Sequence, residues 1–75
     1  MPSASAELVN KLRCYFPEPR DLESECSKYI RACGGKIVRG VISLPKYAYT
    51  KDGPLRECIN YLIDEWDYAE APVHA

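Results

Sequence analysis

The chain has 75 residues, of which 47% are hydrophobic and 28% charged, and its formal net charge is −1. A chain of this length forms one domain with a modest core, and this composition is that of a globular protein. No apolar run reaches the roughly 18 residues of a membrane span, and the first residues lack the pattern of a secretory signal. We therefore expect a cytoplasmic or otherwise intracellular protein that makes no use of a membrane and that has no bulk attraction to nucleic acid.

The first half of the chain predicts two helices. Apolar residues at helical spacing between Leu8 and Phe16 predict a first helix over about residues 5–16, and the prolines that follow end it. Asp21 is a candidate N-cap for a second helix. Gly34 supplies the stop of that helix, because the left-handed position after a helix suits glycine.

A β-hairpin is expected next. Residues 36–44 are rich in β-branched side chains and predict a strand, and residues 47–50 predict a second, edge strand beyond Pro45. We expect these two strands to pair. A turn at Arg39 and Gly40 would shorten both arms and remains an alternative, since Arg-Gly is a weaker turn signal than Asn-Gly.

The last third of the chain predicts one more helix and completes the fold. Pro54 suits the first position of a helix that should run to about Tyr68, and residues 69–75 read as a loose tail. The expected fold is a single α+β domain over residues 1–75, ordered over about 5–68, in which three helices pack with a hairpin in the order α-α-β-β-α. The predicted core contains Leu12, Leu22, Ile30, Ile42, Leu62 and Trp66.

The residues give no signature of catalysis, metal binding or a cofactor. The four cysteines include no C-x-x-C pair, so we expect them to be reduced and without zinc. The only histidine, His74, lies in the predicted tail, where nothing would orient it toward a cysteine nucleophile. We therefore predict no enzyme and no catalytic residue. Cys14 projects away from the apolar face of its helix near two cations, and whether it is reactive stays open.

The last predicted helix favours a protein-binding function, because its two sides differ. Its apolar side is core, whereas Glu57, Tyr61, Asp64 and Tyr68 gather on the other side, and tyrosine is common where proteins touch one another. These four residues are the predicted binding face for a protein partner, with a homodimer as an alternative. The expected function is that of an adaptor, an accessory subunit or a small inhibitor that masks a larger partner. Viruses and mobile elements encode many small inhibitors of this type, so a viral protein is one possibility that we keep as an alternative.

Charge is distributed unevenly along the chain. All ten lysines and arginines lie in residues 1–63, whereas Asp64, Glu65, Asp67 and Glu70 make the end acidic. Two interpretations stay open: the carboxylates keep a surface helix and tail soluble, or they form a docking surface for a basic partner.

Nucleic-acid binding is the alternative function. Basic side chains surround the second helix and the hairpin, and two tyrosines on the predicted edge strand would supply base stacking. The residues of this alternative site are Lys28, Arg31, Lys36, Arg39, Lys46, Tyr47 and Tyr49. The near-neutral net charge argues against it, because nucleic-acid-binding domains are usually plainly basic.

Overall fold

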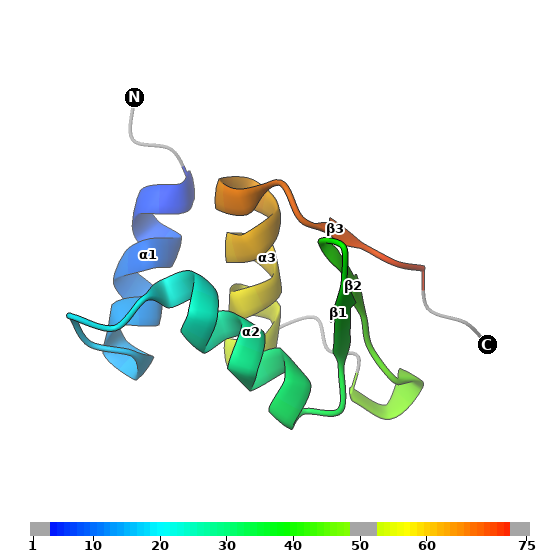
Figure 1. Cartoon of the computed structure of the whole chain (residues 1–75). Coiled ribbons are helices and arrows are strands. Elements are labelled where there is room, and N and C mark those ends of the chain that lie inside the picture. The colour runs from blue at the N-terminus through cyan, green and yellow to red at the C-terminus, as the bar shows by residue number, and fades with distance from the viewer. Residues whose placement is uncertain (1–3, 49–52, 73–75) are drawn as a thin grey trace.

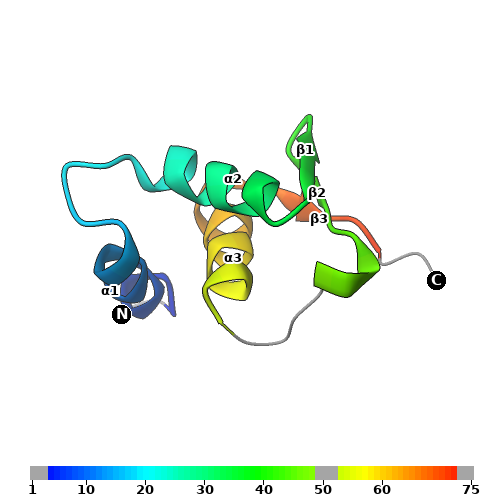
Figure 2. The same ribbon diagram turned by 90° about the horizontal axis from the view of Figure 1, so that it is seen from below.

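The computed structural model describes residues 4–48 and 53–72, except for the side chains of residues 4, 5 and 47. Its elements are α1 (Ala4–Tyr15), α2 (Leu22–Ala32), β1 (Lys36–Val38), β2 (Val41–Ser43), the short 3₁₀ helix η1 (Lys46–Ala48), α3 (Pro54–Trp66) and β3 (Ala69–Glu70). Helix α3 lies at the centre, with α1 on one side and the sheet on the other (Figures 1 and 2). Helix α2 packs across α3 and runs from the α1 side to the sheet. The predicted α+β fold and its order α-α-β-β-α are confirmed.

Local signals set both ends of α2. The Asp21 side chain accepts a hydrogen bond from the backbone N–H of Glu23 at 3.0 Å, which makes it the predicted N-cap. After the helix Gly34 has a φ of 90°, and the N–H of Gly35 donates to the Ile30 carbonyl at 2.9 Å. This pattern of a left-handed glycine followed by a hydrogen bond back to the last turn is the Schellman motif.

The hairpin forms at the alternative turn and not at the preferred one. Strands β1 and β2 are antiparallel, with Ile37 opposite Ile42 and Val38 opposite Val41, so the two-residue turn is Arg39 and Gly40. Both turn residues have positive φ, 51° and 75°, and this twist suits a two-residue hairpin. The prediction of one strand over residues 36–44 was therefore wrong.

The segment after Pro45 also differs from the prediction. Residues 46–48 form η1, whose Ala48 N–H donates to the Pro45 carbonyl at 3.0 Å, instead of the start of an edge strand over residues 47–50. Proline fixes φ near the helical value, so it favours a 3₁₀ turn at this position over continued extension. The rest of the predicted strand lies outside the described residues.

A third strand comes from the segment that the sequence predicted to be a loose tail. Ala69 and Glu70 form β3, which runs parallel to β2 and completes the sheet in the order β1-β2-β3. The Ala69 N–H donates to the Gly40 carbonyl, and the Ala71 N–H donates to the Ile42 carbonyl, each at 2.8 Å. The guanidinium of Arg56 on α3 also binds both carboxylate oxygens of Glu70 at 2.8 Å.

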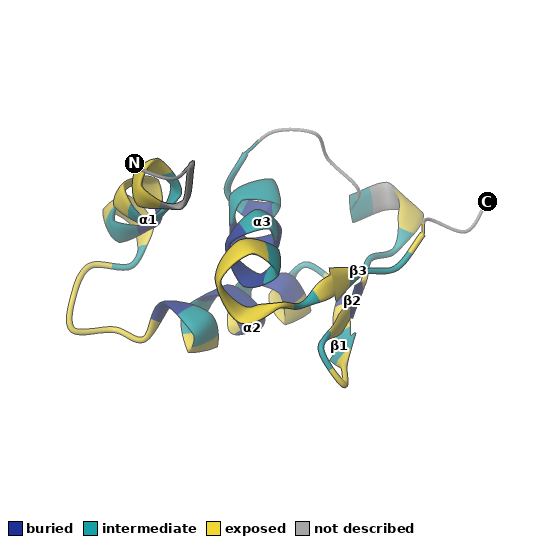
Figure 3. Ribbon diagram, turned by 90° about the horizontal axis from the view of Figure 1, so that it is seen from above, coloured by how far each residue is buried: buried dark blue, intermediate teal, exposed yellow. Residues whose placement is uncertain are grey.

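The core lies where the three helices meet the inner side of the sheet (Figure 3). Five of the six predicted core residues are buried, and the sixth, Trp66, is exposed, so that part of the prediction was wrong. The buried hydrophobic residues are Leu12, Leu22, Cys26, Ile30, Ile42, Leu55, Cys58, Ile59, Tyr61 and Leu62.

Gly35 lies between α2 and β1 and packs closely against the last turn of α2. A Cβ atom at this buried position would lie 2.7 Å from Ile30 Cγ2 and 2.9 Å from the Ile30 carbonyl oxygen. We expect Gly35→Ala to lower the free energy of unfolding by about 1–3 kcal/mol, because the backbone must shift to admit the methyl group. Urea unfolding followed by circular dichroism measures this change. An unchanged midpoint would contradict the prediction.

Candidate functional site

The four side chains predicted to form one binding face do not lie on one open surface. Tyr61 is 9% exposed and belongs to the core, so the expectation that it faces away from the core was wrong. Helix α3 has neighbours on more than one side, which makes its buried arc wider than one stripe (Figure 2). Tyr61→Ala would therefore open a cavity, and a loss of binding in that variant would not identify an interface.

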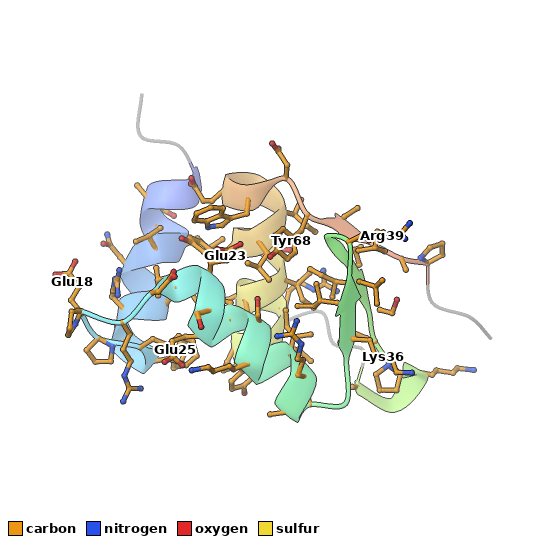
Figure 4. All side chains as sticks on the ribbon, viewed as in Figure 1. Glu18, Glu23, Glu25, Lys36, Arg39 and Tyr68 are labelled. Atoms are coloured by element: carbon orange, nitrogen blue, oxygen red, sulfur yellow. The ribbon has the colours of Figure 1, made fainter. Side chains whose placement is uncertain are left out.

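Glu57 and Tyr68 are half-buried and contact neighbouring helices. The Glu57 carboxylate lies 3.7 Å from Lys11 Nζ on α1. The Tyr68 hydroxyl donates to Glu23 Oε2 on α2 at 2.9 Å (Figure 4), and this bond, together with burial, raises the pKa of the Tyr68 phenol. Of the four predicted residues, only Asp64 is exposed. Whether any of the four contacts a partner stays a prediction.

The exposed aromatic side chain of α3 is instead Trp66. Its side chain belongs by angle to the apolar side of the helix, yet it is 47% exposed, and the last turn of α3 as a whole is exposed (Figure 3). The indole N–H donates to the Tyr61 hydroxyl at 3.2 Å. This bond to a buried partner orients the ring and satisfies its one polar atom, so the exposed remainder is apolar.

Three carboxylates lie next to Trp66 in the sequence, at the C-terminal end of α3, against the preference of a helix C-terminus. Asp64, Glu65 and Asp67 are exposed, and we call them together with Trp66 the Trp66 face. Helices α1 and α2 carry Arg13 and Arg31 in their last turns, as the helix dipole favours, whereas α3 has no basic residue there. An exposed acid at this end is unfavourable by about 0.3–1 kcal/mol. The acids of the Trp66 face therefore do not serve the stability of α3.

The chain that follows Trp66 is held in place by backbone and side-chain hydrogen bonds. Asp67 has a left-handed conformation with a φ of 56°, and the N–H groups of Asp67 and Tyr68 both donate to the Leu62 carbonyl. The next residues are fixed by the Tyr68 bond to α2 and by the pairing of β3 with β2. An ordered surface loses little conformational entropy when a partner binds, which favours affinity.

The residues of the nucleic-acid alternative lie mostly on the outside of α2 and the sheet. Five basic residues are exposed: Lys28, Arg31, Lys36, Arg39 and Lys46. Lys36 and Arg39 lie at the two ends of β1, on the side of the molecule away from α1 (Figure 4). The side chain of Tyr47 and all of Tyr49 lie outside the described residues, so the proposed stacking is untested.

All four cysteines lie in the described part of the chain, and each of them is a free thiol. No three His, Cys, Asp or Glu side chains of residues 4–48 and 53–72 are grouped so that they could share a metal ion. Cys26 and Cys58 are buried, and the adjacent Cys26 thiol and burial raise the pKa of the Cys58 thiol. Cys14 is exposed and its Sγ lies 3.6 Å from the Asn10 carbonyl. Its reactivity stays a prediction.

The helices of the described residues are too short or too polar to span a bilayer. Comparison of the chain with models of protein families, with curated protein sequences and with solved structures finds no match. Function is therefore inferred from the chemistry of the surface.

Proposed function

We propose that the protein is a non-catalytic protein-binding module that contacts its partner through the Trp66 face. The observation that carries the proposal is the exposure of Trp66 together with the hydrogen bond that fixes its ring on the buried Tyr61. Tryptophan is among the residues most enriched at the energetic centres of protein interfaces. A ring that is already oriented before binding loses little side-chain entropy in the complex.

The acidic residues support the same surface. Selection for stability alone disfavours Asp64 and Glu65 at a helix C-terminus. Places where a sequence breaks a local rule without a structural gain are often functional. An adaptor, an accessory subunit or a small inhibitor needs such a surface and no cleft. The four cysteines are free, which suits a reducing compartment, and we propose that the protein acts inside the cell.

The test compares two aromatic side chains of equal exposure. Trp66 and Tyr15 are each 47% exposed, but Tyr15 lies on α1 and outside the Trp66 face. Partners are captured from the host extract with the wild type and their dissociation constants are then measured with purified proteins. We expect Trp66→Ala to weaken binding about 30-fold or more, since a central anchor contributes about 2 kcal/mol or more, and Tyr15→Ala to have little effect.

Circular dichroism checks that both variants keep the fold, and sedimentation reports their oligomeric state. Loss of a wild-type dimer in Trp66→Ala alone would identify the partner as a second copy of the chain. Equal affinity and equal oligomeric state in the wild type and Trp66→Ala would contradict the proposal.

Nucleic-acid binding is the second candidate, and the exposure of its five basic residues favours it. No ion pair among the described residues uses Lys36 or Arg39, so both are free to contact phosphate. Such binding would weaken steeply as salt rises and would fall in Lys36→Gln/Arg39→Gln while Trp66→Ala left it unchanged. A mobility-shift experiment with these two variants separates the two functions.

A further inference from the structure

The charge of the Trp66 face is not neutralised within the described part of the molecule. The two ion pairs of these residues join Lys11 to Glu57 and Arg56 to Glu70. Neither involves Asp64, Glu65 or Asp67, which are all exposed within four consecutive residues of the chain. The free carbonyl groups at the end of α3 add negative potential at the same place.

We propose that the segment bound at the Trp66 face is a basic peptide stretch of the partner, with an arginine stacked on the Trp66 ring. This inference rests on the proposed function. Tryptophan is the best aromatic partner for a cation, and its ring here is held by Tyr61 with an exposed apolar remainder. The planar guanidinium of arginine can stack on this ring, and basic residues of the same peptide can bind the exposed carboxylates at the end of α3.

Other occupants fit the charge less well. A nucleic acid or an anionic membrane surface would be repelled by three exposed carboxylates at a helix C-terminus. A purely apolar partner would strip water from those carboxylates without giving them a counter-charge. A basic segment gains from both the ring and its acidic neighbours, and the charges would also speed its encounter with the protein.

The test selects binders without assuming a partner. Random dodecapeptides displayed on phage are selected on the immobilised full chain, and enriched peptides are then synthesised and titrated. Trp66 is the only tryptophan of the chain, so its fluorescence reports directly on the proposed site. We expect enriched peptides to be net positive and to contain arginine, to change the fluorescence of Trp66, and to bind more weakly as salt rises.

Two matched double variants separate local charge from total charge. Asp64→Asn/Glu65→Gln should weaken peptide binding about tenfold or more, whereas Glu7→Gln/Glu18→Gln removes the same number of exposed charges elsewhere and should not. The first variant should also unfold at a higher urea concentration than the wild type, because it removes charges that oppose the helix dipole. Loss of binding with a gain in stability excludes misfolding as the cause.

The outcomes distinguish this inference from the proposed function. Peptides that depend on Trp66 but carry no positive charge would overturn the inference and leave the protein-binding function in place. Equal binding by the two double variants would also overturn it. Recovery of no peptide whose binding depends on Trp66 would overturn the inference, and the capture experiment decides separately on the function.

Discussion

Replacing Leu62 by alanine is expected to lower the free energy of unfolding by about 2–5 kcal/mol. Leu62 is fully buried in the middle of α3, the helix that contacts α1, α2 and β3. Its truncation removes apolar contacts and leaves a cavity that the surrounding elements cannot all close. Since a domain of this size has a total stability on the order of 5 kcal/mol, the variant should be close to unfolded.

Urea unfolding followed by circular dichroism measures the effect of Leu62→Ala. Leu62→Met nearly conserves volume and hydrophobicity, so it should change the free energy of unfolding by less than about 1.5 kcal/mol. A loss below about 1 kcal/mol in Leu62→Ala would show that the site relaxes or is not central to the core.

Arg56→Met is expected to lower the free energy of unfolding by about 2–4 kcal/mol. The Arg56 guanidinium binds both oxygens of the Glu70 carboxylate, and the two side chains are only 15% and 20% exposed. Removing the cation leaves a poorly hydrated carboxylate beside α3 and releases β3 from that helix. Amide hydrogen exchange should therefore speed up at Ala69 and Ala71, whose N–H groups bind to Gly40 and Ile42.

The other ion pair of α3 provides the control. Lys11 lies 3.7 Å from Glu57 and its side chain is 65% exposed, so water screens the pair and Lys11→Met should change stability by about 1 kcal/mol or less. Arg56→Met/Glu70→Leu should recover part of the loss, because the Glu70 carboxylate is then removed together with the Arg56 guanidinium. Equal losses in Arg56→Met and Lys11→Met would show that the Glu70 contact has no special weight.

The helices could be predicted closely because residues inside or next to each one mark its limits. Asp21 caps α2 and Gly34 follows it, and Pro54 begins α3. These signals act through the backbone of the same few residues, so tertiary contacts hardly alter them. The α+β class followed from the helices and the β-branched stretch between them.

The hairpin register and β3 could not be predicted, because both depend on contacts between distant segments. Arg39 takes a left-handed φ that asparagine or glycine adopts more readily, so the local preference was weak. Placing the turn there brings Ile37 and Ile42 together on the buried side. The ion pair between Glu70 and Arg56 could not be predicted either, because it depends on the position of β3 in the sheet.

The candidate site shows the limit of a helical wheel. Angle alone assigned Trp66 to the core and Tyr61 to the surface, and both assignments were wrong. A wheel does not show which neighbouring elements cover each turn of a helix, and the last turn of α3 is exposed. The run Asp64–Asp67 did carry a signal, since it places acids where the helix dipole disfavours them.

The parallel pairing of β2 with β3 has a consequence for the order of folding. The turn at Arg39 and Gly40 brings β1 and β2 together across two residues, a closure that takes microseconds in isolated hairpins. Strand β3 meets β2 only after the chain has passed through the whole of α3, so this closure loses more chain entropy and requires the helix to be docked. We therefore expect β3 to join the sheet as the last step of folding. The Trp66 face should become rigid at that step.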